Sequence, residues 1–312
     1  MDETTAAIVT GRANPELAKK IAEDLNMKLL EVEIAQFKDG EIQAYYNETI
    51  RGKSVFIIQP TFGPAENLIE LLILIDAAKR ASAHQIIAVI PYFGYGRQDR
   101  KDKPRTSIGA KLMANLLIAA GVSRVVTLDL HADQIQGFFE IPVDHLYSSN
   151  VFYPYIQSLK LDNLCMVSPD TGGTKRASTY AKALNCDLAI GFKHREKQNE
   201  VSTLQIIGDV KDKNCIIVDD IIDTGGTLIK AANKLKENGA KSVMAMCAHG
   251  LLSGNGLQNI ESSTIDKLIL TDTIPMKQES DKVEIVTVAH LLAEVIKSVM
   301  DMTSISSHFL FN

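Results

Sequence analysis

The sequence predicts an α/β protein made of two similar domains, each with a mostly parallel β-sheet flanked by helices. The chain has 312 residues, more than a single hydrophobic core comfortably serves. Short β-branched runs alternate with helical patterns along its whole length. One order of strand, loop, helix and strand also occurs twice. Such alternation is typical of parallel sheets that are covered by helices on both faces.

The predicted elements follow from these patterns in chain order. Buried strands are predicted at 55–59, 86–91, 125–130, 165–167 and 215–219. Helices are predicted at 15–25, 67–81, 108–120, 175–184 and 228–238. A last strand and helix within 284–300 are expected to return and pack on the first domain.

A weak internal repeat indicates duplication. Segment 51–59 (RGKSVFIIQ) resembles 211–219 (KDKNCIIVD), and each is followed by a loop, a helix, a small-residue turn and another strand. Any two strand–helix–strand units look somewhat alike, but the matched order and near-constant offset favour two copies of one domain. The pattern breaks at 144–149. The predicted division is a first domain at 1–146, a second at 147–290 and a C-terminal segment at 291–312 that packs back on the first.

Composition excludes several classes of protein. The net charge of -5 argues against a surface that coats nucleic acid, so no nucleic-acid partner is expected. The four cysteines lie far apart without zinc-ligand spacing, which indicates reduced thiols. The N-terminus lacks the basic and apolar regions of a signal peptide, and the apolar stretch 68–78 contains Glu70 and Asp76. We therefore expect a cytoplasmic protein with no membrane partner.

A loop rich in carboxylates, glycines and threonines follows the predicted strand 215–219. Gly225 and Gly226 let backbone N–H groups approach a ligand, and the positive end of the next helix suits a phosphate. Asp219 and Asp220 are poor neighbours for a phosphate but good acceptors for paired sugar hydroxyls. The segment therefore predicts a site for ribose 5-phosphate. Its residues are Asp219, Asp220, Asp223, Thr224, Gly225, Gly226 and Thr227.

The alternative for this loop is a capped helix after an acidic turn, since Asp and Thr are ordinary N-cap residues. Three carboxylates within five residues, directly after an apolar strand, favour the ligand site. The matching loop of the first copy, 59–64, reads QPTFGP and lacks these groups. If the domains arose by duplication, one half kept a ligand loop and the other lost it.

The loop closely resembles the ribose-phosphate loop of the type I phosphoribosyltransferase fold. Further motifs are FKDGE at 37–41, YFGYGRQDR at 92–100, DLHADQIQGFF at 129–139, SPDTGG at 168–173 and GDV at 208–210. Each motif alone is moderately specific, whereas their joint order is very specific. Together they resemble the ribose-phosphate pyrophosphokinase family (phosphoribosyl-pyrophosphate synthetases), and the likeness runs from about residue 11 to 309.

The resemblance implies an ATP site and a magnesium requirement. It assigns ATP contacts to Phe37, Asp39, Gly40, Glu41, Arg97 and Gln98, with Phe37 stacking on the base. On its residues alone, 37–41 reads equally well as a plain turn before a strand. The resemblance makes His131 and Asp170 contacts of the Mg·ATP unit. Because Mg²⁺ prefers oxygen ligands, Asp170 is the better metal-side residue, and His131 could instead touch phosphate or metal-bound water.

The resemblance also implies the reaction. The anomeric oxygen of ribose 5-phosphate attacks the β-phosphorus of ATP and AMP leaves, with Lys193 and Arg195 stabilising the transferring group. Family members are typically hexamers, so a homo-oligomer is expected. An allosteric site for phosphate or ADP is implied near Arg51 and Ser82, with Ser306 and Ser307 as further contributors.

Three other functions remain open at this point. A phosphoribosyltransferase that consumes phosphoribosyl pyrophosphate would require no ATP and would have no role for Arg97 or Lys193. An inactive regulatory relative would have lost the catalytic residues, whereas Lys193 and Arg195 are present. An RNA-binding regulator on the same fold would need a basic, aromatic-bearing face that the acidic balance argues against.

Overall fold

The computed structural model describes residues 5–194 and 203–306, which form two compact units. Unit 1 contains the chain up to Ser148, residues 273–275 and the segment that begins at Thr287. Unit 2 contains the described residues of Ser149–Asp272 and Met276–Val286. The chain therefore leaves unit 1 after Ser148, returns to it briefly at 273–275 and joins it again from Thr287.

Unit 1 is built on a five-stranded parallel sheet in the order β1-β4-β5-β6-β7. A separate antiparallel hairpin consists of β2 and β3. The elements are β1 Ala6–Thr10, α1 Pro15–Asp24, β2 Val32–Gln36, β3 Ile42–Tyr46, β4 Ser54–Ile58, α2 Glu66–Arg80, β5 Gln85–Ile90, α3 Gly109–Ala120, β6 Arg124–Leu128, the 3-10 helix η1 Asp133–Phe138, β7 Val143–Leu146 and α8 Ala289–Met300.

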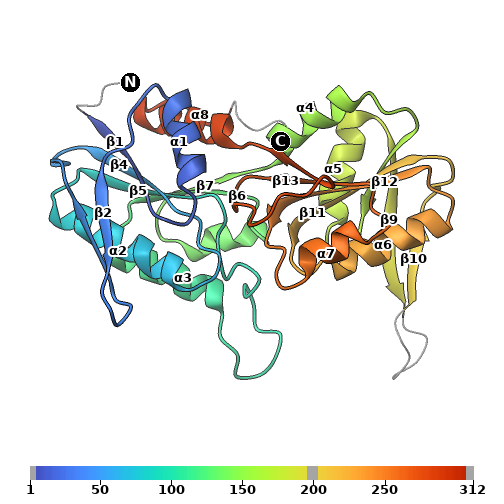
Figure 1. Ribbon diagram of the computed structural model, residues 1–312, viewed down its shortest axis with the longest axis horizontal. Coiled ribbons are helices and arrows are strands. Elements are labelled where there is room, and N and C mark those ends of the chain that lie inside the picture. The colour runs from blue at the N-terminus through green and yellow to red at the C-terminus, as the bar shows by residue number, and fades with distance from the viewer. Residues whose placement is uncertain (1–4, 195–202, 307–312) are drawn as a thin grey trace. The chain divides into compact units, whose positions relative to one another are not determined.

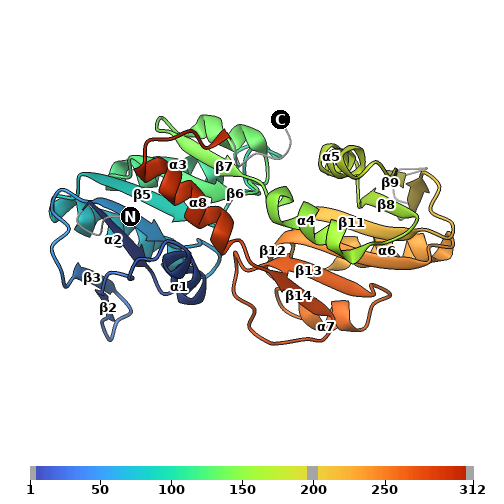
Figure 2. The ribbon, with the colours of Figure 1, turned by 90° about the horizontal axis from the view of Figure 1, so that it is seen from above.

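Helices cover both faces of the unit 1 sheet. Figure 1 shows α1 and α8 on one face and α2 and α3 on the other. The second face packs a continuous apolar core, in which strand residues such as Val55 and Ile57 meet Leu71, Leu74 and Leu117 of the helices. Such burial removes apolar side chains from water and is the main favourable contribution to folding. Helix α8 packs directly against α1, which agrees with its place beside α1 in Figure 2.

Unit 2 is built on a seven-stranded sheet in the order β10-β9-β8-β11-β12-β13-β14. All neighbouring strands are parallel except β9 and β10. The elements are α4 Ser149–Leu159, β8 Leu164–Ser168, α5 Thr174–Leu184, β9 Asp187–His194, β10 Thr203–Ile207, β11 Asn214–Ile222, α6 Gly226–Glu237, β12 Ser242–Gly250, α7 Gly256–Glu261, β13 Lys267–Thr271 and β14 Val283–Val286.

The unit 2 sheet is also covered on both faces (Figure 1). Phe152 and Ile156 of α4 join Tyr180 of α5 and strand residues in one apolar cluster. Leu228 and Leu235 of α6 pack with the opposite face of the same strands in a second cluster. The central strands are therefore apolar on both sides, as the continuous β-branched runs predicted.

The two units repeat one topology, which confirms the predicted α/β fold class. The order β1-β4-β5-β6-β7 in unit 1 matches β8-β11-β12-β13-β14 in unit 2. In each unit an antiparallel strand pair follows the helix that comes after the first strand: β2–β3 follows α1 in unit 1, and β9–β10 follows α5 in unit 2. The hairpin stands apart as its own sheet in unit 1, whereas β9 pairs with β8 in unit 2.

One strand, β11, runs further than the sequence predicts. Strand β11 continues to Ile222 because its pairing with β12 extends to Ile221↔His249 and Ile222↔Gly250. Asp219 and Asp220 therefore lie on the strand itself, and only the glycine turn follows it. Strand β9 runs to His194, so the backbone of Lys193 also lies on a strand. Among the described residues, no helix combines the length and apolar character needed to cross a membrane.

Candidate active site

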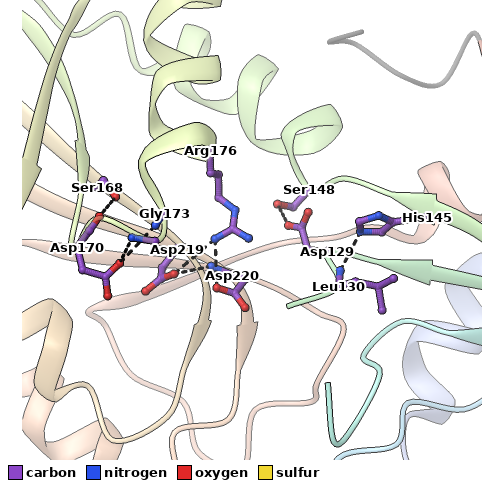
Figure 3. Close-up of polar contacts among 11 residues, drawn as sticks. Asp129, Leu130, His145, Ser148, Ser168, Asp170, Gly173, Arg176, Asp219 and Asp220 are labelled. Carbon is purple, nitrogen blue, oxygen red and sulfur yellow. Dashed lines mark hydrogen bonds and ion pairs between the residues drawn. The ribbon is translucent and has the colours of Figure 1, made fainter. Parts of the chain in front are cut away.

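Two neighbouring carboxylates lie at the carboxyl end of β11, where parallel sheets place their ligands. Arg176 of α5 reaches both of them (Figure 3). Its Nη1 atom donates to Asp220 Oδ1 over 3.1 Å and to Asp219 Oδ1 over 3.4 Å. The side chain of Asp220 is 9% exposed and that of Asp219 is 22% exposed. The pair is thus largely shielded from water and shares the Arg176 cation.

Burial and the neighbouring charge change the acidity of this pair. Loss of hydration and the charge of Asp220 together raise the pKa of Asp219 to about 7, although Arg176 acts in the opposite direction. A carboxyl group with this pKa changes its charge near neutral pH. The site can therefore respond to a ligand that supplies hydrogen-bond donors to both carboxylates.

The turn after β11 presents backbone N–H groups. Gly225 has φ +82°, a left-handed conformation that favours glycine, and it caps the start of α6. The Asn259 side chain fixes the turn by donating to the Thr224 carbonyl over 3.1 Å. Thr224, Gly226 and Thr227 are exposed around this helix start. Backbone N–H groups at a helix start, hydroxyls and the helix dipole together form a suitable place for a phosphate.

Asp170 organises a second turn in unit 2, at the end of β8. Its Oδ1 atom accepts hydrogen bonds from the backbone N–H groups of Gly172 at 2.9 Å and Gly173 at 3.3 Å (Figure 3). The Ser168 hydroxyl donates to the Asp170 carbonyl over 2.5 Å. The carboxylate thus holds the turn that opens α5, the helix that carries Arg176.

The strand that carries Lys193 passes very close to this turn. A Cβ atom at Gly191 of β9 would lie 2.4 Å from the Pro169 carbonyl oxygen, so only glycine fits there. Two residues further along β9 stands Lys193, for which the backbone alone is described. Arg195 lies outside the described residues. The close contact at Gly191 therefore places the part of β9 that precedes Lys193 next to the Asp170 turn.

In unit 1, His131 follows β6 on a turn that buried polar groups hold. Asp129 is buried with φ +40° and accepts a hydrogen bond from the Ser148 hydroxyl. The buried His145 accepts the Leu130 N–H at Nε2 over 2.9 Å (Figure 3). His131 itself is exposed. Within the described parts of the chain, no group of three or more His, Cys, Asp or Glu side chains is arranged to hold a metal ion.

Arg97 and Gln98 lie on an exposed loop between β5 and α3. Gly94 anchors the start of the loop: its N–H donates to Thr61 Oγ1 over 2.8 Å, and a Cβ atom there would lie 2.0 Å from the Thr61 carbonyl oxygen. The Gln98 carbonyl accepts from the N–H of Ala110 in α3 over 3.2 Å. The loop therefore has fixed ends and an exposed face rich in cations.

Phe37 to Glu41 form the tip of the β2–β3 hairpin. The Phe37 N–H donates to the Glu41 carbonyl over 2.8 Å, and Gly40 takes φ +98°. The side chain of Asp39 accepts from the Glu41 N–H over 3.2 Å. Phe37 is 52% exposed, which is unusual for a large aromatic side chain. The tip is a plain turn in its backbone, yet it presents an aromatic ring to its surroundings.

Comparison with known proteins decides the family. The family profile for the N-terminal domain of ribose phosphate pyrophosphokinase matches residues 6–121, and that for the phosphoribosyl synthetase-associated domain matches residues 192–311. A ribose-phosphate pyrophosphokinase of Porphyromonas gingivalis is 51% identical over 311 residues, which is 99% of each chain. The chain belongs to the ribose-phosphate pyrophosphokinase family. A Campylobacter jejuni member is 52% identical over 304 residues, 97% of this chain and 98% of its own.

A solved structure of the same family supports the fold. The phosphoribosylpyrophosphate synthetase of Mycobacterium smegmatis superimposes with a TM-score of 0.90 at 38% identity, covering 96% of this chain and 99% of its own. The likeness therefore includes both units. Full-length relatives named pyrophosphokinases also favour this reading over a phosphoribosyltransferase or an RNA-binding regulator.

Sequence reasoning missed Arg176, although the ribose-phosphate pyrophosphokinase fold brings it to the predicted carboxylates. A signal was available, because Arg176 stands one turn into the helix after the GG pair at 172–173. Strand β8 lies beside β11 in the sheet, so the start of α5 and the end of β11 meet at one edge. Linking the two segments requires the strand order, which the local pattern does not contain.

Proposed function

We propose that the chain is a ribose-phosphate diphosphokinase. It transfers the β,γ-diphosphate of ATP to the C1 hydroxyl of ribose 5-phosphate and so forms phosphoribosyl pyrophosphate and AMP for nucleotide biosynthesis. The observation that carries this proposal is the edge of unit 2, where two carboxylates and a glycine turn at a helix start lie in succession. The full-length relatives, which are ribose-phosphate pyrophosphokinases, support the reaction.

Ribose 5-phosphate fits this edge in one direction. Its phosphate would lie against the turn Asp223–Thr227, where backbone N–H groups and the Thr224 and Thr227 hydroxyls are available. Its 2- and 3-hydroxyls would donate to Asp219 and Asp220. A phosphate placed at the carboxylates instead would meet like charge, which disfavours the reverse orientation.

ATP is proposed to contact the exposed segments of unit 1. Phe37 would stack on the adenine ring, with Asp39, Gly40 and Glu41 beside it. Arg97 and Gln98 would hold the nucleotide from the β5–α3 loop. Aromatic stacking and cationic contacts suit a base joined to a polyphosphate. The exposure of Phe37 supports this role, since a ring without a partner would gain by burial.

Catalysis of diphosphoryl transfer depends mainly on positioning and on neutralising developing charge. We assign Lys193 and Arg195 as the catalytic cations. The close contact between Gly191 and Pro169 supports the assignment of Lys193, because it sets the backbone of β9 close to the Asp170 turn. Removing such a cation costs on the order of 3–5 kcal/mol of transition-state stabilisation.

The described residues fit a magnesium ion that arrives with the nucleotide. Mg²⁺ keeps several waters and is usually bound through one or two carboxylates plus substrate phosphates, so no enclosed cluster is required. Asp170 and His131 would contact the Mg·ATP unit. Asp170 Oδ1 is occupied by two N–H groups, which keeps the carboxylate oriented. The bound ion would supply positive charge to the phosphates.

Family resemblance extends the proposal to assembly and control. We propose a cytoplasmic homo-oligomer, a hexamer, with phosphate or ADP as allosteric effectors. Arg51 and Ser82 would contribute to the effector site together with Ser306, whereas Ser307 lies outside the described residues. The four cysteines are free thiols, which agrees with a reducing compartment.

The test is one incubation with Mg·ATP, ribose 5-phosphate and inorganic phosphate, followed by separation of the nucleotide products. AMP formed in step with phosphoribosyl pyrophosphate is the expected result, and Lys193→Ala should lower turnover by about a hundredfold to several thousandfold. ADP as the stoichiometric product would contradict diphosphoryl transfer. Nucleotide binding without turnover would indicate a regulatory subunit.

A further inference from the structure

Arg176 has a fixed position at the start of α5. The helix begins at Thr174, and the turn before it is held by the Asp170 carboxylate through the N–H groups of Gly172 and Gly173. A Cβ atom at Gly173 would lie 2.9 Å from the Ser168 hydroxyl, so the turn is also tightly packed. The backbone of Arg176 is therefore anchored from the same turn that contains a predicted metal-side residue.

The guanidinium group joins two carboxylates that would otherwise repel one another. Nη1 lies 3.1 Å from Asp220 Oδ1 and 3.4 Å from Asp219 Oδ1, and the Arg176 side chain is 26% exposed. The Asp220 N–H also donates to Asp219 Oδ1 over 2.9 Å. One cation and one N–H thus fix the orientation of the pair before any ligand is present.

An ionised carboxylate only accepts hydrogen bonds, whereas a protonated one also carries an O–H donor and has fewer acceptor sites. The two hydroxyls of a ribose diol are therefore best accepted when both carboxylates are ionised. Two like charges at a poorly hydrated site cannot both remain ionised without a compensating cation. We propose that Arg176 is a positioning residue of the ribose site, which holds Asp219 and Asp220 side by side as paired acceptors for the sugar hydroxyls. This inference rests on the proposed function.

The surroundings of Asp219 support this role. Its carboxyl faces Asp220 on the same strand, Arg176 from α5 and the Cys247 thiol from β12. Burial raises the pKa of Cys247 well above its ordinary value, and the charges of Asp219 and Asp220 raise it further, so the thiol stays neutral. Among these groups, the positive charge that opposes protonation of Asp219 comes from Arg176.

A purely structural role would be an alternative, since the same contacts join α5 to the sheet. The two roles differ in their dependence on pH. Loss of a structural tether weakens binding by a similar factor at every pH. Loss of a group that keeps the carboxylates ionised shifts the pH at which ribose 5-phosphate affinity is lost, because Asp219 then takes up its proton at higher pH.

The experiment measures the Kd of ribose 5-phosphate by calorimetry on the full chain, from about pH 5.5 to pH 8.5. It compares the unmodified protein with Arg176→Gln, Arg176→Lys and Asp219→Asn. Lys182→Gln serves as the matched control, because it removes an exposed cation from the same helix. Thermal unfolding of each variant verifies that it is folded. The sugar phosphate ionises identically in every titration, so differences between variants report on the protein.

Arg176→Gln should weaken binding at neutral pH by roughly 10- to 100-fold and move the affinity profile to higher pH. Arg176→Lys should recover most of the affinity, and Lys182→Gln should match the unmodified protein. A profile for Arg176→Gln that is parallel to the unmodified one at all pH values would overturn the inference. If Arg176→Lys fails to fold, the shift in Arg176→Gln still decides the question.

Failure of the proposed function would look different. The unmodified protein would then not bind ribose 5-phosphate, or Asp219→Asn would bind it as well as the unmodified protein does. Strong binding that depends on Asp219 but not on Arg176 would contradict the positioning role alone. The two proposals are therefore separated within one set of titrations.

Discussion

The carboxyl ends of β4 and β11 occupy matching places in the two units, yet their polar groups differ. Gln59, which follows β4, is fully buried, and its Oε1 atom accepts the Ala13 N–H over 3.1 Å. Its Nε2 atom donates to Glu70 and to the Asn67 carbonyl. Glu70 in turn accepts from the backbone and side chain of Arg12, each over 2.6 Å. The polar groups of this edge satisfy one another within the fold.

The unit 2 edge has the opposite character. Asp219 and Asp220 share Arg176, which leaves the three groups with a net negative charge and further acceptor sites. The loops also differ, since Pro60 and Pro64 of unit 1 have no N–H to offer, whereas Gly225 and Gly226 do. One topology therefore supports two outcomes: a closed structural network in unit 1 and the proposed ligand site in unit 2.

The largest expected effect comes from making unit 2 resemble unit 1. Asp219→Asn combined with Asp220→Asn should lower kcat/KM for ribose 5-phosphate by about a thousandfold. Each carboxylate would lose a charge-assisted hydrogen bond worth about 1.5–3 kcal/mol. Steady-state kinetics measure the loss. The control is Asp162→Asn, which changes an exposed carboxylate of the same unit. An equal loss of kcat/KM in this control would contradict a specific role for the carboxylates at the end of β11.

The converse change tests the unit 1 edge. Glu70→Gln should lower the free energy of unfolding by about 2–3 kcal/mol, because an amide cannot accept all the hydrogen bonds that reach the buried Glu70 carboxylate. Urea unfolding measures this change. Affinity for ribose 5-phosphate should stay the same.

The matched control for Glu70→Gln is Asp76→Asn, which breaks an exposed pair with Arg80 on the same helix. It should change stability very little. A large loss of ribose 5-phosphate affinity in Glu70→Gln would show that the unit 1 edge is more than structural.

The carboxyl pair also makes stability depend on pH. The folded pKa of Asp219, about 7, lies above its ordinary value of 3.8, so folding takes up a proton between these values. Stability from this group is therefore fully present below about pH 4 and is lost as pH rises to about 7. Asp219→Asn should be more stable than the unmodified protein at pH 8, by about 2 kcal/mol, and equally stable near pH 4. Unfolding curves at both pH values test the sign.

The smallest predicted effect concerns the glycine turn. Gly225→Ala should cost about 1 kcal/mol of stability, because alanine is strained at φ +82°. It should also raise KM for ribose 5-phosphate about fivefold by displacing an N–H group of the phosphate turn. Gly52→Ala has a similar φ of +76° and open space around it, so it controls for strain alone. Equal KM values for the two variants would show that the Gly225 turn does not contribute to phosphate binding.

Much of the fold follows from local sequence. Buried β-branched runs and amphipathic helices arise from side-chain periodicity, so the strands and helices lie close to their predicted places. The repeated order of elements also indicated the duplicated sheet. The glycine turn, its threonines and the adjoining carboxylates are contiguous in the chain, so this part of the proposed site could be named from the sequence.

Tertiary structure alone decided which distant residues meet. Arg176 reaches Asp219 and Asp220 across more than 40 positions because β8 and β11 are neighbours in the sheet. His145 supports the Leu130 turn for the same kind of reason, through the pairing of β6 and β7. A local pattern specifies periodicity and turns, whereas strand order depends on the packing of the whole sheet. The sequence by itself determined the elements and the ligand turn, and packing determined the charge balance around them.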